Sequence, residues 1–186
     1  MSRGTPINVK AMVETLGEAG YGVDLLTYPY GEPLEIENVN LLRSLKIPGI
    51  KSIPIGPSWV KILLDIPFTL YAFYLSFRNK YDLVHGIEEA AFIAGIIGIL
   101  TKKPFIYDMD SCMPTQLKDS GFLNIKPLLS FVKALESFFI KRSAGILTVC
   151  SALSDKAKKK ASDSSRVFQI EDFPYEPTTE LSLIHI

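Results

Sequence analysis

Short apolar runs alternate along the chain with longer segments that have the apolar spacing of helices. The runs that predict strands span residues 22–27, 39–45, 82–85, 104–107, 145–149 and 166–170. The segments that predict helices span residues 6–19, 59–78, 88–100, 127–142 and 151–161. This alternation is typical of parallel sheets covered by helices. We therefore predict an α/β fold, a Rossmann-like doubly wound parallel sheet in one domain over residues 1–173, followed by the start of an interdomain linker at 174–180.

The residues ahead of the first predicted helix are of types that are typical of loops. Arg3, Gly4 and Thr5 precede Pro6, which suits the first turn of a helix. A glycine loop that feeds a helix ordinarily follows a strand, so we expect that a first strand of the sheet precedes residue 1. Gly4 would let backbone N–H groups approach a phosphate or a sugar, and Arg3 would neutralise a phosphate beside it.

The segment 59–78 is unusually apolar. It carries Asp65 and Pro67, and its apolar run is shorter than the roughly 20 residues that a membrane-spanning helix needs. We expect Ser58 to cap this helix, Pro67 to kink or split it, and the helix to lie in the core. The alternative is a helix that docks on a membrane surface through Trp59, Lys61, Phe73, Phe77, Arg78 and Lys80.

Composition narrows the function classes. Twenty basic and twenty acidic residues cancel over 186 residues, so no strong overall field attracts nucleic acid. The two cysteines, Cys112 and Cys150, fit no metal or redox spacing, which favours a reducing, cytoplasmic setting. The lysines at 156 and 158–160 are most simply the solvated face of the helix at 151–161.

Polar residues gather where the strands predicted at 82–85 and 104–107 end. His85 ends the first strand, and Asp108 and Asp110 follow the second. Because the carboxyl ends of parallel strands form the ligand crevice of such sheets, we predict that these three side chains lie together on one rim of a single sheet. Glu88 and Glu89 begin the next helix, where the helix dipole favours carboxylates, so capping is expected before ligand binding.

The Asp108-Met109-Asp110 sequence after an apolar strand allows three interpretations. It resembles the metal-binding Asp-x-Asp of GT-A glycosyltransferases. It also resembles the first motif of Mg²⁺-dependent haloacid-dehalogenase-type phosphatases, in which Asp108 would be the nucleophile and Asp110 the acid/base. The third interpretation is a cleft loop whose carboxylates bind ligand hydroxyls. We favour the third, because a long α/β pattern precedes the motif, whereas a phosphatase of that type begins with it.

Several short motifs occur in the order and spacing of a known family. They are Arg3-Gly4-Thr5, the segment Glu18 to Asp24, Tyr81-Asp82-Leu83-Val84-His85, Pro104-Phe105-Ile106-Tyr107, and the segment Ala144 to Ser151. Through them the chain resembles the amino-terminal, acceptor-side domain of family 4 glycosyltransferases of the GT-B type. The resemblance covers roughly residues 2–174. It departs from many relatives at Asp108 to Ser111, where they often carry a histidine.

The resemblance implies roles for particular residues. His85 matches the family's strand-end histidine and is the candidate catalytic residue. The candidate substrate-binding residues are Arg3, Gly4, Thr5, Glu88, Glu89, Asp108, Asp110 and Ser111. No metal and no resident cofactor are expected, because by resemblance the nucleotide-sugar donor binds chiefly to a second domain. The implied activity is transfer of a sugar to a hydroxyl acceptor; a sugar- or lipid-phosphate-binding module without turnover is a further alternative.

The end of the chain breaks the pattern. Residues 181–186 continue no periodicity and resemble the translation of a transposase adapter, so we interpret them as a sequencing artefact and give His185 no functional weight. We expect the protein to continue naturally into a second, donor-binding domain. The chain as it stands is therefore expected to be catalytically incompetent by itself.

Overall fold

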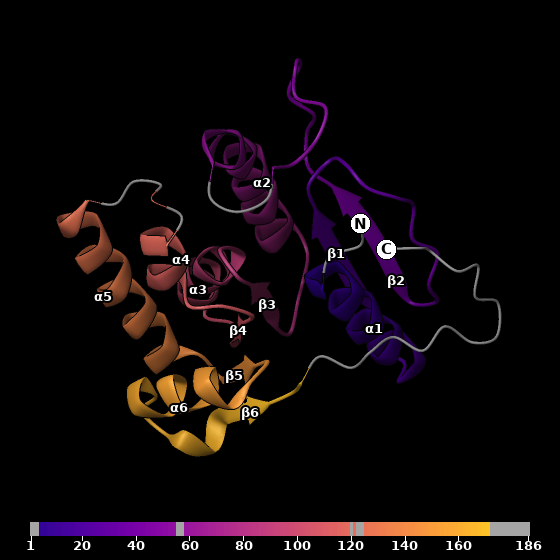
Figure 1. Cartoon of the computed structure of the whole chain (residues 1–186). Coiled ribbons are helices and arrows are strands. Elements are labelled where there is room, and N and C mark those ends of the chain that lie inside the picture. Colours follow the sequence, from indigo (N-terminus) through magenta and orange to yellow (C-terminus); the bar gives the residue numbers. More distant parts are fainter. Residues whose placement is uncertain (1–3, 55–57, 120, 122–124, 172–186) are drawn as a thin grey trace, which may run out of the picture.

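The computed structural model describes residues 4–54, 58–119, 121 and 125–171, which form an α/β fold (Figure 1). Its helices are α1 (Gly4–Glu18), α2 (Trp59–Arg78), α3 (Ala90–Thr101), α4 (Met113–Asp119), α5 (Lys126–Arg142) and α6 (Ser151–Lys160), with a short 3₁₀ turn, η1 (Ser164–Arg166). Its strands are β1 (Val23–Thr27), β2 (Val39–Arg43), β3 (Val84–Ile87), β4 (Phe105–Met109), β5 (Gly145–Thr148) and β6 (Val167–Gln169). Arg3 lies outside the described residues, as do the predicted linker and the last six residues.

The named strands pair in parallel throughout, as the predicted fold class requires. They form two sheets: β1 pairs with β2, and β3, β4, β5 and β6 follow one another in chain order. The parallel Rossmann-like class is thus confirmed. The expectation of a single hydrogen-bonded sheet is not met within the described residues, because β1 and β3 are not paired there.

The core lies between the four-stranded sheet and the helices α3, α5 and α6. Tyr107, Met109, Phe139, Ile140 and Ile146 are almost completely buried in it. Phe139 of α5 packs edge-on against Phe105 and contacts Phe92 of α3, which ties two helices to β4. This apolar layer accounts for the near-continuous burial of β4 and β5, as expected for parallel strands.

The amino-terminal part of the chain forms the smaller, two-stranded sheet and the helix that packs on it. Helix α1 packs on β1 and β2, and Gly20 follows its end with a left-handed backbone (φ 84°), as is common for a glycine at a helix carboxyl end. The helix begins at Gly4 and not at Pro6, so Gly4 and Thr5 belong to its first turn. The prediction that they form a loop ahead of the helix is wrong.

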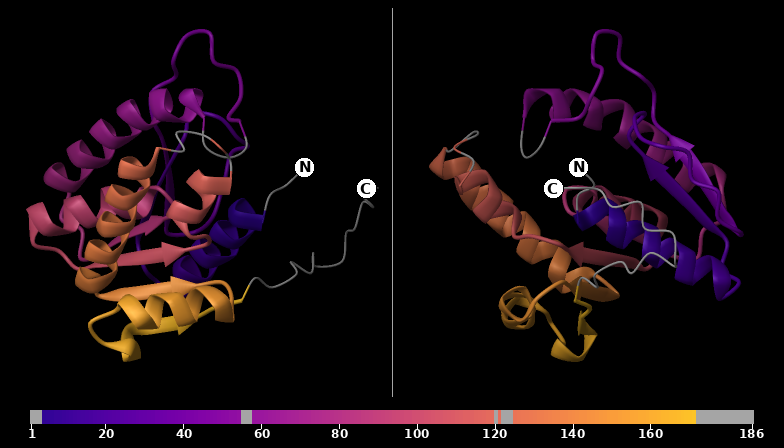
Figure 2. Two further views of the ribbon diagram at one scale, coloured as in Figure 1. Left: turned by 60° about the vertical axis from the view of Figure 1, so that its left-hand side comes forward. Right: turned by 45° about the vertical axis from the view of Figure 1, so that its right-hand side comes forward.

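Helix α2 crosses the molecule as one continuous 20-residue element (Figure 2). Ser58 caps it as predicted, accepting a hydrogen bond from the Lys61 amide, and Pro67 does not split it. By length and composition it could cross a membrane, yet only 11% of its most apolar 18-residue stretch is buried inside the protein. The expectation of a core helix is therefore wrong: Trp59, Leu63, Ile66, Leu70, Tyr74 and Phe77 are exposed.

Candidate functional site

A histidine–aspartate pair joins the edge strand β3 of the four-stranded sheet to its neighbour β4. His85 Nε2 is 3.0 Å from Asp108 Oδ2, and the two side chains are 21% and 11% exposed. The register pairs His85 with Ile106, so Asp108 is the diagonal neighbour two residues further along β4. Residues two apart on a strand share one face of the sheet, which is why the side chains meet.

The same alternation places this pair on the face away from α3. A Cβ on Gly86 would meet Ala91 Cα at 2.6 Å, so position 86 faces α3 and its neighbour His85 faces the other way. The sequence analysis predicted both residues at strand ends. The structure corrects this: His85 is the second residue of β3 and Asp108 the fourth of β4.

Glu88 and Glu89 follow β3 in a strained turn. Glu88 has a left-handed backbone (φ 52°), which is unusual for a residue with a side chain, and its N–H donates to the Asp108 carbonyl at 3.1 Å. Burial raises the pKa of the Glu88 carboxyl, and the nearby charges of Glu89 and Asp110 raise it further. A partly buried carboxyl with a raised pKa is a candidate for proton exchange or for donating a hydrogen bond to a ligand.

The expected capping role of these glutamates is not what the structure shows. Helix α3 begins at Ala90, and the Glu89 side chain makes no capping hydrogen bond. Glu89 instead forms an ion pair with Lys61, which lies on α2. The pair joins the turn after β3 to the first turns of α2, a long-range contact that sequence periodicity does not reveal.

A second polar contact lies next to this ion pair and was also missed. Tyr28, just after β1, donates its hydroxyl to Asp65 on α2. Burial raises the pKa of the Asp65 carboxyl, and burial together with the Asp65 hydrogen bond raises the pKa of the Tyr28 phenol. Through Asp65 and Lys61, α2 therefore connects Tyr28, just after β1, to Glu89, in the turn after β3.

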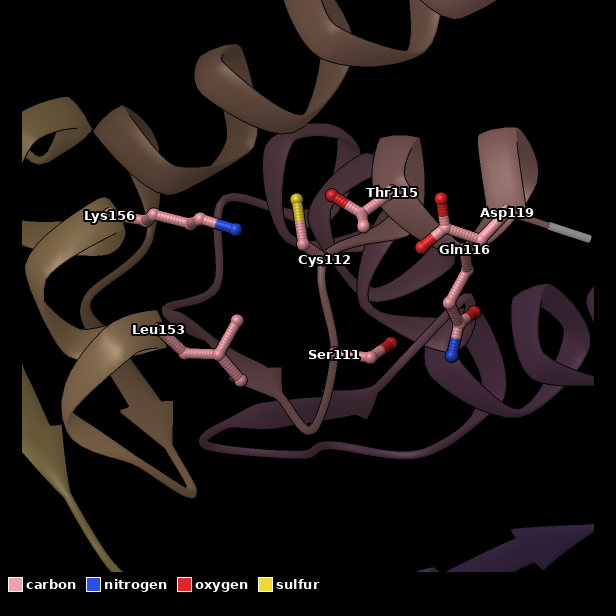
Figure 3. A pocket seen from close by; sticks show the side chains of 7 residues that line it. All are labelled: Ser111, Cys112, Thr115, Gln116, Asp119, Leu153 and Lys156. Carbon is pink, nitrogen blue, oxygen red and sulfur yellow. The ribbon is translucent and has the colours of Figure 1, made fainter.

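Ser111 stands two residues after the end of β4 and lines a cavity of about 390 Å³. The other lining residues are Cys112, Thr115, Gln116, Asp119, Leu153 and Lys156. Lys156 extends from α6 toward Cys112, and α4 supplies Thr115 and Gln116 from the opposite wall (Figure 3). Among the residues that the structure describes, the buried Ser111 hydroxyl has no hydrogen-bond partner. A buried hydroxyl without a partner is unusual in a folded protein and calls for an explanation, such as a bound water or ion.

The segment around Asp108 and Asp110, interpreted from the sequence as a cleft loop, is partly strand and is followed by a helix. Asp108 belongs to β4, and α4 occupies Met113–Asp119, so the loop reduces to a few residues around Asp110 and Ser111. Lys156, assigned to a solvated face, lines the cavity, and Lys160 pairs with the buried Glu136. Gly4 and Thr5 sit in α1, which packs on the other sheet from His85 and Asp108.

Several acidic side chains lie around the ends of β3 and β4. Within the described residues, no group of three or more His, Cys, Asp or Glu side chains is arranged to hold a metal ion. The Asp108 carboxylate is engaged by His85. This contact orients both side chains and occupies one of the two oxygens of the Asp108 carboxylate.

These features define a class: a parallel α/β domain with a His–Asp pair and a hydroxyl-lined cavity at the carboxyl half of adjacent strands. Comparison with protein families gives the more particular assignment. The family described as Glycosyltransferase Family 4 matches residues 3–170, nearly the whole chain, and the chain belongs to this family. Comparison with curated proteins found no match. Family membership favours the glycosyltransferase interpretation over the phosphatase.

Proposed function

We propose that this chain is the acceptor-binding half of a nucleotide-sugar-dependent glycosyltransferase of the GT-B type. It would position a hydroxyl acceptor, glycan or lipid-linked, for sugar transfer in cell-envelope glycan synthesis. The observation that carries the proposal is the His85–Asp108 pair, with the Ser111 cavity three residues further along the chain from Asp108, in a family 4 domain. Sugar hydroxyls both donate and accept hydrogen bonds, and the cavity offers hydroxyl, amide, carboxylate and ammonium groups.

In this proposal His85 is the catalytic residue. An imidazole held by a carboxylate has a defined orientation and can donate to, or accept from, the reacting hydroxyl. Asp108 orients it, while Ser111, Asp110 and Glu88 contact the acceptor. The nucleotide-sugar donor, the other partner of the reaction, binds chiefly to a second domain. No metal and no resident cofactor take part, and the protein works in the cytoplasm at the inner face of the membrane.

Acceptor binding is testable on the chain itself, because it holds only two histidines, His85 and His185. With ¹⁵N-labelled histidine, titration with mono- and disaccharides or with short-chain glycolipids should shift the His85 imidazole resonances saturably and leave those of His185 in place. Asp108→Asn should weaken this binding about tenfold or more, because a hydrogen bond to a charged group contributes about 1.5–3 kcal/mol.

The exposed substitution Asp155→Asn is the matched control, since it removes the same charge outside the site and should leave binding unchanged. Two results would overturn the proposal. One is a set of saccharides and glycolipids that leaves the His85 resonances unmoved. The other is Mg²⁺-dependent release of phosphate from a phosphomonoester by this chain, abolished in Asp108→Asn, which would establish the phosphatase.

A further inference from the structure

A second pocket opens at the opposite end of the strands. It has a volume of about 330 Å³ and lies where the chain enters β4 and β5, at Pro104 and Ala144. Its lining residues are Gly98, Ile99, Lys102, Lys103, Pro104, Phe105, Arg142 and Ala144. The His85–Asp108 pair and the Ser111 cavity lie toward the carboxyl ends of the same strands, so the two pockets are separate.

The polar side chains of this pocket are all cationic. Lys102, Lys103 and Arg142 line it without a carboxylate, and none of the three forms an ion pair within the described residues. Helices α3 and α5 end here, and each carboxyl end carries the equivalent of about half a negative charge. Those two ends offset about one of the three positive charges, so the pocket remains cationic.

The backbone positions of Lys102 and Lys103 are fixed by the end of α3. Lys102 adopts a left-handed conformation (φ 56°) as the carboxyl cap of α3, and the Lys103 amide donates to the Gly98 carbonyl at 3.0 Å. Lys103 Nζ donates to the Asn79 carbonyl at 3.3 Å, just beyond the end of α2. This contact brings the exposed Arg78 and Lys80 to the same edge of the molecule.

Exposed apolar side chains lie directly beside the cations. Ile99 and Leu100, in the last turn of α3, are 39% and 58% exposed, and Ile99 also lines the pocket. Phe138 of α5 is exposed beneath the Arg142 guanidinium, which lies 4.8 Å from its ring centre. The end of α2 adds the exposed Phe77. Cations next to exposed apolar groups match the boundary between lipid headgroups and acyl chains.

We propose that this pocket binds the phosphate headgroup of an anionic phospholipid, while Ile99, Leu100 and Phe77 enter the outer part of the bilayer. A soluble phosphate would gain nothing from these apolar neighbours. The chain has no net charge, so attraction to an anionic membrane must come from a local cluster such as this one. The proposal supplies a contact for the membrane location suggested above, and it does not depend on sugar transfer.

The test is cosedimentation with phosphatidylcholine vesicles, with and without phosphatidylglycerol. The chain should bind the anionic vesicles and not the neutral ones, and added salt should release it. The triple variant Lys102→Gln/Lys103→Gln/Arg142→Gln should bind about a hundredfold more weakly, because each basic residue near an anionic surface contributes about 1 kcal/mol, or about fivefold. Leu100→Gln should weaken binding as well.

A matched control separates the pocket from overall charge. Lys133→Gln/Lys158→Gln/Lys159→Gln removes three exposed positive charges elsewhere and should bind like the unmodified chain. Equal loss in both triple variants, failure of the unmodified chain to bind anionic vesicles, or release by inorganic phosphate with no effect of Leu100→Gln would overturn the proposal. Thermal unfolding of each variant shows that it folds, and His85 titration with saccharides reports the acceptor site separately.

Discussion

At the scale of single residues, neighbouring positions of β3 face opposite sides of the sheet and need different side chains. His85 faces Asp108 across the sheet, while position 86 faces α3 so closely that only glycine fits. The helix backbone therefore sets how β3 lies, and β3 in turn holds the imidazole against its carboxylate. The orientation of the candidate catalytic group depends on the absence of a side chain at the next residue.

Gly86→Ala should accordingly destabilise the fold. The added Cβ would lie 2.5 Å from the Ala90 carbonyl oxygen and 2.6 Å from Ala91 Cα, and these backbone atoms cannot move independently of α3. Overpacking of this kind costs about 1–3 kcal/mol, to be measured as a lower free energy of unfolding in urea. The control is Gly22→Ala, where a Cβ meets nothing within 4 Å; it should stay within about 0.5 kcal/mol of the unmodified chain.

A second residue-scale prediction concerns a buried ion pair. Glu136 on α5 is fully buried and pairs with Lys160, 24 positions along the chain on α6. Lys160→Met should cost about 3–5 kcal/mol in urea unfolding, because it leaves a buried carboxylate without its cation. Glu136→Leu/Lys160→Met should recover most of that loss; a double variant as unstable as the single one would show that the pair is not the cause.

The sequence indicated which residues are important more readily than it indicated which of them contact each other. It singled out His85 and Asp108 because each was predicted at the carboxyl end of a short apolar run. It did not predict that both lie within their strands, where alternation along neighbouring strands places them on one face. It assigned Lys160 to solvent, since four lysines within five residues normally form a solvated face. The contacts of Glu89 with Lys61 and of Tyr28 with Asp65 link distant segments, so no local pattern could predict them.

At the scale of elements, boundaries were predicted within a few residues where a backbone signal marks them. Gly20 ends α1 and Ser58 begins α2 as expected. Helix α3 starts later than predicted because Glu88 has a left-handed backbone. Nothing in the local sequence indicates this conformation, which is uncommon for glutamate. Helix α4 was missed since it is short and lies in a polar stretch.

The exposed face of α2 gives an element-scale prediction. Trp59, the only tryptophan of the chain, lies on that face and is 63% exposed. If α2 lies along the membrane surface, anionic vesicles should shift the Trp59 emission to shorter wavelength, because the indole leaves water. Neutral vesicles should cause little shift. An unchanged spectrum in vesicle-bound protein would restrict the membrane contact to the pocket end of the molecule.

At the scale of the whole molecule, stability should respond to pH through two partly buried carboxyls. The pKa values of Asp65 and Glu88 are raised above their ordinary values, chiefly by burial. The folded state therefore holds protons at pH values where the unfolded chain has lost them. Their stabilising contribution is fully present below the unfolded values of about 4 and is lost as the pH rises through the raised folded values.

Asp65→Asn/Glu88→Gln removes both titrations. The difference in thermal midpoint between the unmodified chain and this variant should therefore shift in favour of the unmodified chain as the pH falls from 7 toward 4. Parallel midpoint curves across that range would show that the two carboxyls titrate alike in the folded and unfolded states.

The two sheets should also differ in local stability. No residue of β1 or β2 is fully buried, whereas β4 and β5 are buried along most of their length and anchor the main core. Amide hydrogens of strands with few buried contacts exchange through small local openings, while those of core strands need larger ones. Hydrogen exchange followed by NMR should therefore give lower protection for Leu25 and Leu41 than for Tyr107 and Ile146. Equal protection would mean that both sheets open together, as one cooperative unit despite the missing pairing between β1 and β3.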